Sequence, residues 1–201
     1  QRLRIHIERD AFAQMAPHWQ RLGFPFAQLV PSYALAIGSG ADRPDALADL
    51  MAIILNNGMR QPTYIMNKLH FAQDTPYETV FAPDPGKQDR VMDIAVAQAL
   101  RQALTKVVTA GTAQRVNGIF VGPDRLPVTV GGKTGSGDNQ LITVSRNGRT
   151  RSVQSTNRTA TFVFYIGDRY YGVLMAYVPG READKYHFTS SLPVTILKMI
   201  S

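Results

Sequence analysis

One short stretch of the sequence gathers groups that can bind an anion. In VTVGGKTGSGDNQ (Val128–Gln140), Lys133 is followed directly by Thr134, Gly135 and Ser136, at the end of a run rich in β-branched residues. A lysine ammonium beside two hydroxyl groups offers one positive charge and two neutral hydrogen-bond donors. Such a set fits either a phosphate-binding loop or the anion-binding edge of a serine acyl-transfer site.

The residues around Lys133 exclude the phosphate loop. A P-loop needs a glycine five positions before the glycine that precedes its lysine, so that successive backbone N–H groups surround the phosphates, and a helix must follow. The corresponding position holds Pro127, which has no backbone N–H, and Thr134 is followed by GSGDNQ and then by β-type sequence. The pattern therefore favours the strand edge.

In a β-strand the four residues divide between two faces. Lys133 and Gly135 point to one face, whereas Thr134 and Ser136 point to the other or, with the twist near a strand end, toward the edge groove. The cation and the hydroxyls suit a carboxylate, and Gly135 lets another backbone approach closely. A lone Lys-Thr-Gly string is expected by chance in roughly one chain of this length in twenty, so the surrounding elements have to support the assignment.

Apolar residues fall near helical spacing in the first part of the chain. They run from Phe12 to Leu22, but Pro17 interrupts them, so we expect a broken or kinked helix that ends at Gly23. The segment Thr63–Phe71 mixes strand-forming residues and is expected to hold a short strand, followed by a turn-rich stretch.

Two later segments predict amphipathic helices. The first begins at Pro44, which suits the first helical position, and Gly58 terminates it. The second runs from Arg90 to about Thr109, and Gly111 stops it. The side chains expected to face the core are Leu47, Leu50, Met51, Ile54 and Leu55 in the first helix and Val96, Leu100, Leu104, Val107 and Val108 in the second.

After the second helix the apolar residues alternate, which indicates strands. Asn147-Gly148 supplies the pair of positive φ angles that a type I′ turn requires, so we expect an inserted hairpin between the first two strands. A short helix closes the chain. Helices followed by antiparallel strands and a last helix indicate an α+β fold. The expected strands are Val128–Thr134, Ala160–Ile166 and Tyr171–Val178.

Composition limits the classes of protein to which the chain can belong. Its 201 residues, 44% of them hydrophobic, can bury the core of one domain, and no apolar run is long enough to cross a membrane. The chain has no cysteine, and its four histidines lack metal-ligand spacing, so neither a disulfide nor a metal is expected. The net charge of +7 favours an anionic partner or simply a soluble basic surface.

The order of these elements resembles the C-terminal half of the transpeptidase domain of penicillin-binding proteins, most closely the class A type. The resemblance rests, in this order, on PSYALAIGSG, ALADLMAIILNNG, VVTAGTAQRV, VGGKTGSGDN and TFVFYIGDRYYGVLMAYV. It implies an antiparallel sheet flanked by helices beside an all-helical lobe, incomplete here on its N-terminal side. Residues 1–115 are then mainly helical, and residues 116–201 hold the strands with the KTG motif and a C-terminal helix.

The resemblance also implies a reaction, which is acyl transfer from the D-Ala-D-Ala end of a peptidoglycan stem peptide, or acylation by a β-lactam antibiotic. By resemblance, Lys133 and Thr134 hold the carboxylate of the substrate or drug, Gly135 keeps the strand edge open, and Ser136 adds a hydroxyl. The backbone N–H of Ser136 is then one of two oxyanion donors. The implied location is extracytoplasmic, in a parent protein anchored to the membrane upstream. Neither a cofactor nor nucleic acid is implied.

The nucleophile of this family is the serine of an S-x-x-K motif, yet none of the nine serines here is followed three residues later by lysine. Ser145–Asn147 and Ser155–Asn157 match the family's S-x-N motif only as strings, because both come after Lys133. In relatives a stretch like RLRIHIERD directly follows S-x-N. We therefore expect the nucleophile to lie upstream of Gln1, and the chain alone to be inactive and to associate with its missing half or with itself.

Two features depart from the family pattern. About two dozen residues (137–159) separate the KTG motif from the next strand, and Thr161 stands where the family has Trp. Asp138 and Asn139 are expected in a turn, and the arginines of the insertion either contact an anionic polymer or, as we favour, keep a loop soluble. These arginines are Arg146, Arg149, Arg151 and Arg158. The rival to an enzyme is a non-catalytic module whose transpeptidase-like sheet binds peptide carboxylates or an anionic cell-wall polymer.

Overall fold

The computed structural model describes residues 2–37, 42–83, 86, 88–145, 147 and 150–201. It combines helices, two short strand pairs and one three-stranded sheet. The helices are α1 (Arg2–Arg21), α2 (Pro44–Leu55), α3 (Ile94–Thr109) and α4 (Ser191–Met199), with 3₁₀ turns at Tyr33–Ile37 (η1), Gln114–Val116 (η2) and Arg181–Lys185 (η3). The strands are β1 (Met59–Arg60), β2 (Leu69–Phe71), β3 (Thr79–Phe81), β4 (Asp89–Arg90), β5 (Val130–Val144), β6 (Thr150–Ile166) and β7 (Tyr170–Pro179).

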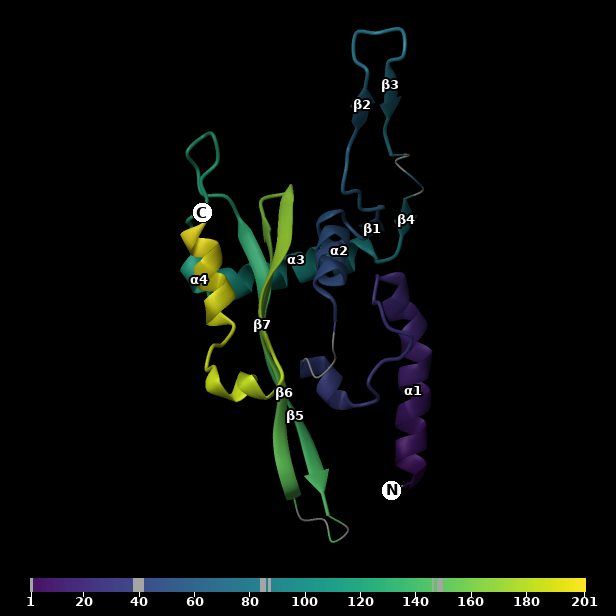
Figure 1. Cartoon of the computed structure of the whole chain (residues 1–201), viewed down its shortest axis with the longest axis vertical. Helices are drawn as coiled ribbons and strands as arrows, with labels where there is room; N and C mark the ends of the chain where they lie inside the picture. Colours follow the sequence, from purple (N-terminus) through teal and green to yellow (C-terminus); the bar gives the residue numbers. More distant parts are fainter. Residues whose placement is uncertain (1, 38–41, 84–85, 87, 146, 148–149) are drawn as a thin grey trace.

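The three-stranded sheet is antiparallel, in the order β5-β6-β7. In Figure 1, α4 lies on one side of these strands and α2 on the other, while α3 crosses near β5. This arrangement confirms the expected α+β fold and the three expected strands. The main hydrophobic cluster joins the end of α3, η2, the sheet and α4, and consists of Val108, Ala113, Val116, Val130, Phe162, Val194 and Leu197.

The insertion at residues 137–159 lengthens β5 and β6 and does not separate them. The two strands pair continuously from Val130 opposite Ile166 to Val144 opposite Thr150, with shifts of register after Asn139 and after Thr143. The hairpin predicted there is therefore an arm that continues the sheet (Figure 1). Asp138 and Asn139 lie in β5, so the prediction of a turn at these residues is wrong. Their backbone groups join the ladder opposite Arg158 and Asn157.

The first helix is continuous through Pro17, so the predicted break does not occur there. α1 continues to Arg21 with Pro17 inside it, and the backbone hydrogen bond lost at the proline does not end the helix. The predicted end at Gly23 is confirmed. Gly23 has a φ of 99°, and its N–H donates to Gln20 O while Phe24 N–H donates to Trp19 O, each at 3.0 Å. This pair of bonds is a Schellman motif.

The buried face of α3 matches the predicted one only in part. Val108 is fully buried and Val107 packs against the core, as predicted. Val96 and Leu100 are 50% and 38% exposed, and Ala97 is fully buried instead. The helix begins at Ile94, later than predicted, because the side chain of Asp93 accepts a hydrogen bond from Ala95 N–H at 2.8 Å and caps it.

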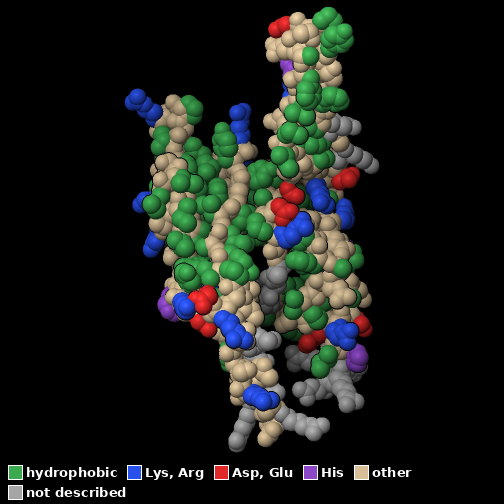
Figure 2. All heavy atoms as spheres, in the orientation of Figure 1, with side chains coloured by type: hydrophobic (Ala, Val, Ile, Leu, Met, Phe, Trp, Pro, Cys, Tyr) green, Lys and Arg blue, Asp and Glu red, His purple; other side chains and the backbone are tan. Residues whose placement is uncertain are grey.

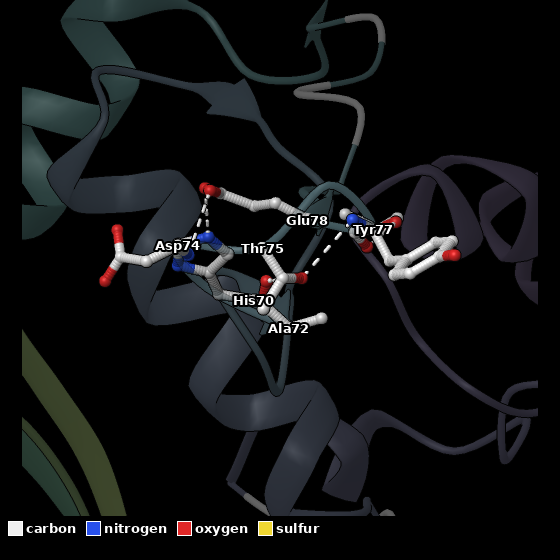
Figure 3. A network of polar contacts seen from close by, with 7 residues as sticks. His70, Ala72, Asp74, Thr75, Tyr77 and Glu78 are labelled. Carbon is white, nitrogen blue, oxygen red and sulfur yellow. Dashed lines mark hydrogen bonds and ion pairs between the residues drawn. The ribbon is translucent and has the colours of Figure 1, made fainter.

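The segment predicted to hold one strand and a turn-rich stretch forms a projecting hairpin. Only Leu69–Phe71 of the predicted strand is extended, and it pairs with Thr79–Phe81. Figure 1 shows this hairpin at the top of the molecule, and Figure 2 shows hydrophobic side chains along it. Its turn is held by polar contacts (Figure 3), in which His70 Nε2 lies 2.5 Å from Glu78 Oε1 and Thr75 Oγ1 donates to Ala72 O at 2.7 Å.

Tyr165 connects α3 to the sheet from within the core. Its side chain is fully buried, and its hydroxyl lies 2.6 Å from Thr105 Oγ1 and 3.3 Å from Arg101 O. Gly131 stands opposite Tyr165 in the ladder. A Cβ at Gly131 would lie 2.4 Å from the Tyr165 ring, so the strand can hold no larger residue there without displacing the ring.

We predict that Gly131→Ala destabilises the fold by about 1–3 kcal/mol, because the added methyl group overpacks a buried site. Gly135→Ala is the matched control in the same strand, since a Cβ there meets no described atom within 4 Å. Urea unfolding of both variants and the parent chain measures the difference. Equal midpoints for Gly131→Ala and Gly135→Ala would contradict the packing described for Tyr165.

Candidate functional site

The four candidate residues lie side by side on β5, the edge strand of the sheet. Lys133, Thr134, Gly135 and Ser136 pair in order with the β6 residues Val163, Phe162, Thr161 and Ala160. Thr134 is 8% exposed, and its ladder partner Phe162 is fully buried. Lys133 and Gly135 are exposed. Ser136 is exposed as well, so strand alternation separates the buried Thr134 from Lys133 and Gly135, while Ser136 lies at the accessible part of the edge.

The hydroxyl of Thr134 is held from the core side. Its Oγ1 lies 2.6 Å from Thr112 Oγ1, and Thr112 stands between α3 and η2. Because a buried hydroxyl without a partner is costly, this contact explains how a polar residue occupies a buried strand position.

Ser136 is anchored to the start of the last helix. Its Oγ accepts a hydrogen bond from the backbone N–H of Ser190 at 2.8 Å, and Ser190 directly precedes α4. A hydroxyl that accepts one bond still has its own proton to donate. Ser136 therefore keeps a donor for a ligand while its position is set by α4.

Lys133 supplies a positive charge that no described carboxylate neutralises. Its Nζ donates a hydrogen bond to the carbonyl oxygen of Thr134 at 2.7 Å. Among the described residues this is the one polar contact of the Lys133 side chain. An ammonium group has three donors, so two stay available. The open space beside Gly135 leaves this edge accessible.

Thr112 and Ser190 were not among the predicted site residues, although both contact predicted ones. Thr112 follows Gly111 in the sequence VVTAGTAQRV, and Ser190 lies in the hydroxyl-rich run Thr189–Ser191. Their residue types gave a weak signal, because hydroxyls at helix ends are usually caps. Only the fold brings them to β5.

The insertion arginines have different environments. Arg146 and Arg149 lie outside the described residues. Arg151 is exposed, whereas Arg158 donates from Nε to Phe188 O at 3.1 Å and has its guanidinium carbon 5.8 Å from the centre of the Phe188 ring. Arg158 therefore contributes packing within the domain and is not simply a solubilising loop residue.

The described residues contain no group of three or more His, Cys, Asp or Glu side chains that could hold a metal ion. No helix within the described ranges is long and apolar enough to cross a membrane. His70 pairs with Glu78 in the projecting hairpin, far along the chain from β5 (Figure 3).

We compared the chain with models of protein families and with solved structures. Residues 32–193 match the family model for the penicillin binding protein transpeptidase domain. Penicillin-binding protein 3 of Mycobacterium tuberculosis in complex with aztreonam is 17% identical, with a TM-score of 0.55 over 90% of this chain and 44% of that one. PBPA of the same organism is 17% identical, with a TM-score of 0.53 over 95% of this chain and 49% of that one.

A third similar structure is the D,D-transpeptidase domain of a peptidoglycan glycosyltransferase from Eggerthella lenta, 14% identical, with a TM-score of 0.52 over 98% of this chain and 50% of that one. No curated protein matches the chain. The chain thus spans about half the length of the structures that it resembles. Since the family model covers most of its residues, the chain belongs to the penicillin-binding protein transpeptidase domain family.

Proposed function

We propose that this chain is the substrate-carboxylate half of a serine-type peptidoglycan transpeptidase. The observation that carries the proposal is the exposed Lys133 on an edge strand, followed on the same strand by two hydroxyls held by hydrogen bonds and by the open glycine position between them. A stem peptide that ends in D-Ala-D-Ala presents a carboxylate to such an edge, and a β-lactam presents a similar one. The likeness to the class A type remains a prediction.

In this proposal each residue has a separate role. Lys133 binds the carboxylate by a charge-assisted hydrogen bond, which is stronger than a neutral one. Ser136 donates its hydroxyl proton to the same group, and its backbone N–H faces the developing oxyanion during acyl transfer. Thr112 orients the Thr134 hydroxyl from the core side, and Gly135 lets the substrate backbone come close.

We further propose that the nucleophile comes from a segment outside these 201 residues. Support comes from the sequence, in which no serine has a lysine three residues later, and from the chain's coverage of 44% to 50% of the similar structures. We also propose that the parent protein acts outside the cytoplasm, where peptidoglycan is built, with a membrane anchor upstream. The isolated chain then binds no drug covalently.

The first prediction for this function concerns the isolated chain. Incubated with a fluorescent penicillin and denatured, it should show no labelled band, because acylation needs an activated serine. A band that survives denaturation, and that disappears after preincubation with unlabelled penicillin, would show that the chain carries its own nucleophile.

The second prediction concerns Lys133 in the parent protein. Lys133→Ala should slow acylation by a β-lactam at least about tenfold, since a charge-assisted contact contributes roughly 1.5–3 kcal/mol. Lys198→Ala, in the last turn of α4, removes the same charge elsewhere and should leave the rate unchanged. Stopped-flow measurement of the acylation rate compares the two variants with the parent protein. Equal rates for Lys133→Ala and Lys198→Ala would show that Lys133 does not belong to the site.

The third prediction concerns partners of the chain. We propose that the outer edge of β7 pairs with another strand, either from the rest of the parent protein or from a second copy. β7 pairs only with β6 among the described strands, and Tyr170 and Tyr177 on it are 69% and 55% exposed. Exposed edges of this kind drive association.

Sedimentation velocity of the purified chain tests this proposal. We expect dimers or larger species at high concentration, and a shift toward monomer when Tyr177→Lys places a charge on the edge strand. A well-folded chain that stays strictly monomeric and binds no hydrophobic dye would contradict the proposal that the outer edge of β7 pairs with another strand.

A further inference from the structure

A polar hollow lies away from β5, where the end of α1 meets the β1–β4 pair. It has a volume of about 500 Å³. Figure 2 shows basic and acidic side chains gathered on this face of the molecule. Its lining residues are Arg21, Asp49, Arg60, Gln61, Pro62, Thr63, Asp89, Arg90 and Val91. None of them belongs to the strand that carries Lys133.

Three arginines of this hollow are fixed by backbone carbonyls. Arg21 Nη2 donates to Arg90 O at 2.8 Å, and Arg60 Nη1 donates to Arg21 O at 3.3 Å. Arg90 Nη1 donates to Asn57 O at 2.9 Å. These bonds hold three like charges at one place, although each guanidinium has five N–H donors and uses only one or two of them.

The acidic residues of the hollow do not neutralise these charges. Asp49 Oδ1 accepts a hydrogen bond from Thr63 Oγ1 at 2.7 Å, and no described carboxylate forms an ion pair with Arg21, Arg60 or Arg90. Three positive and two negative side chains leave the lining with a net charge of 3 − 2 = +1. The unused donors and the surplus charge both favour an anion.

We propose that this hollow binds an oxyanion group, a carboxylate or a phosphate, through the guanidinium groups of Arg60 and Arg90, with Arg21 beside them. Arginine presents its donors in a planar fork that matches both groups in a bidentate manner. A bound anion also offsets the repulsion between three guanidinium groups that the backbone contacts hold together. Binding here requires neither Lys133 nor a nucleophile, so it is independent of the transpeptidase reaction.

A binding experiment on the whole chain tests this site. Inorganic phosphate and, separately, glutarate are titrated at constant ionic strength, and the ¹H–¹⁵N signals of arginine side chains and of residues 60, 61, 63 and 89–91 are followed. We expect saturable shifts there with at least one of the two probes. Saturation by phosphate alone assigns a phosphate-bearing ligand, and saturation by glutarate alone assigns a carboxylate. No saturable shift with either probe would overturn the proposal.

Variants separate a specific site from general attraction to a basic protein. Arg60→Gln should weaken binding at least tenfold, whereas Arg151→Gln, which removes the same charge from an exposed position on the arm, should not change it. Asp89→Asn should tighten binding several-fold, because it removes a negative charge from the lining while Arg60 and its contacts remain. Equal dissociation constants for Arg60→Gln and Arg151→Gln would show that the arginines only hydrogen-bond the backbone and bind no anion. A dissociation constant that Asp89→Asn leaves unchanged would show the same.

Discussion

Tyr165 is fully buried between α3 and β5, and its hydroxyl has to be hydrogen-bonded because a buried, unpaired hydroxyl is costly. The Thr105 hydroxyl and the carbonyl oxygen of Arg101, which lie one turn apart on α3, form hydrogen bonds with it. The ring can occupy this place only because Gly131 has no side chain. This contact fixes where β6 and its ladder neighbour β5 lie relative to α3. It thereby positions the candidate residues, which lie two to five positions after Gly131 on β5.

The alternation of side chains along β5 then determines which candidate residue is buried and which is exposed. The face that packs against Phe162 takes Thr134, which needs Thr112 as a polar partner inside the core. The opposite face leaves Lys133 with its charge in solvent. The same strand geometry that buries one hydroxyl thus exposes the cation beside it, and the helix that covers the buried face anchors Ser136.

Much of the fold follows from local sequence signals, whereas the site depends on distant contacts. The three strands, the helix after Pro44 and the glycine end of α1 were predictable, because periodicity and capping act over a few residues. The predicted inner face of α3 holds at Val107 and Val108 but not at Val96 and Leu100. Sequence patterns also did not indicate that Thr105 bonds Tyr165, 60 residues away. Likewise Thr112 and Ser190 reach β5 from 22 and 54 residues away, and no local pattern reports such separations.

The two edges of the sheet are protected to different degrees. β5 carries Lys133 and two shifts of register, after Asn139 and after Thr143, and charges and bulges of this kind discourage pairing with other chains. β7 contains no charged residue between Tyr170 and Pro179. The exposed lysine on β5 therefore protects that edge against pairing with other strands, and in the proposed function the same charge binds the substrate carboxylate. β7, which pairs only with β6 among the described strands, lacks this protection, and for that reason the proposed strand partner is placed at β7 rather than at β5.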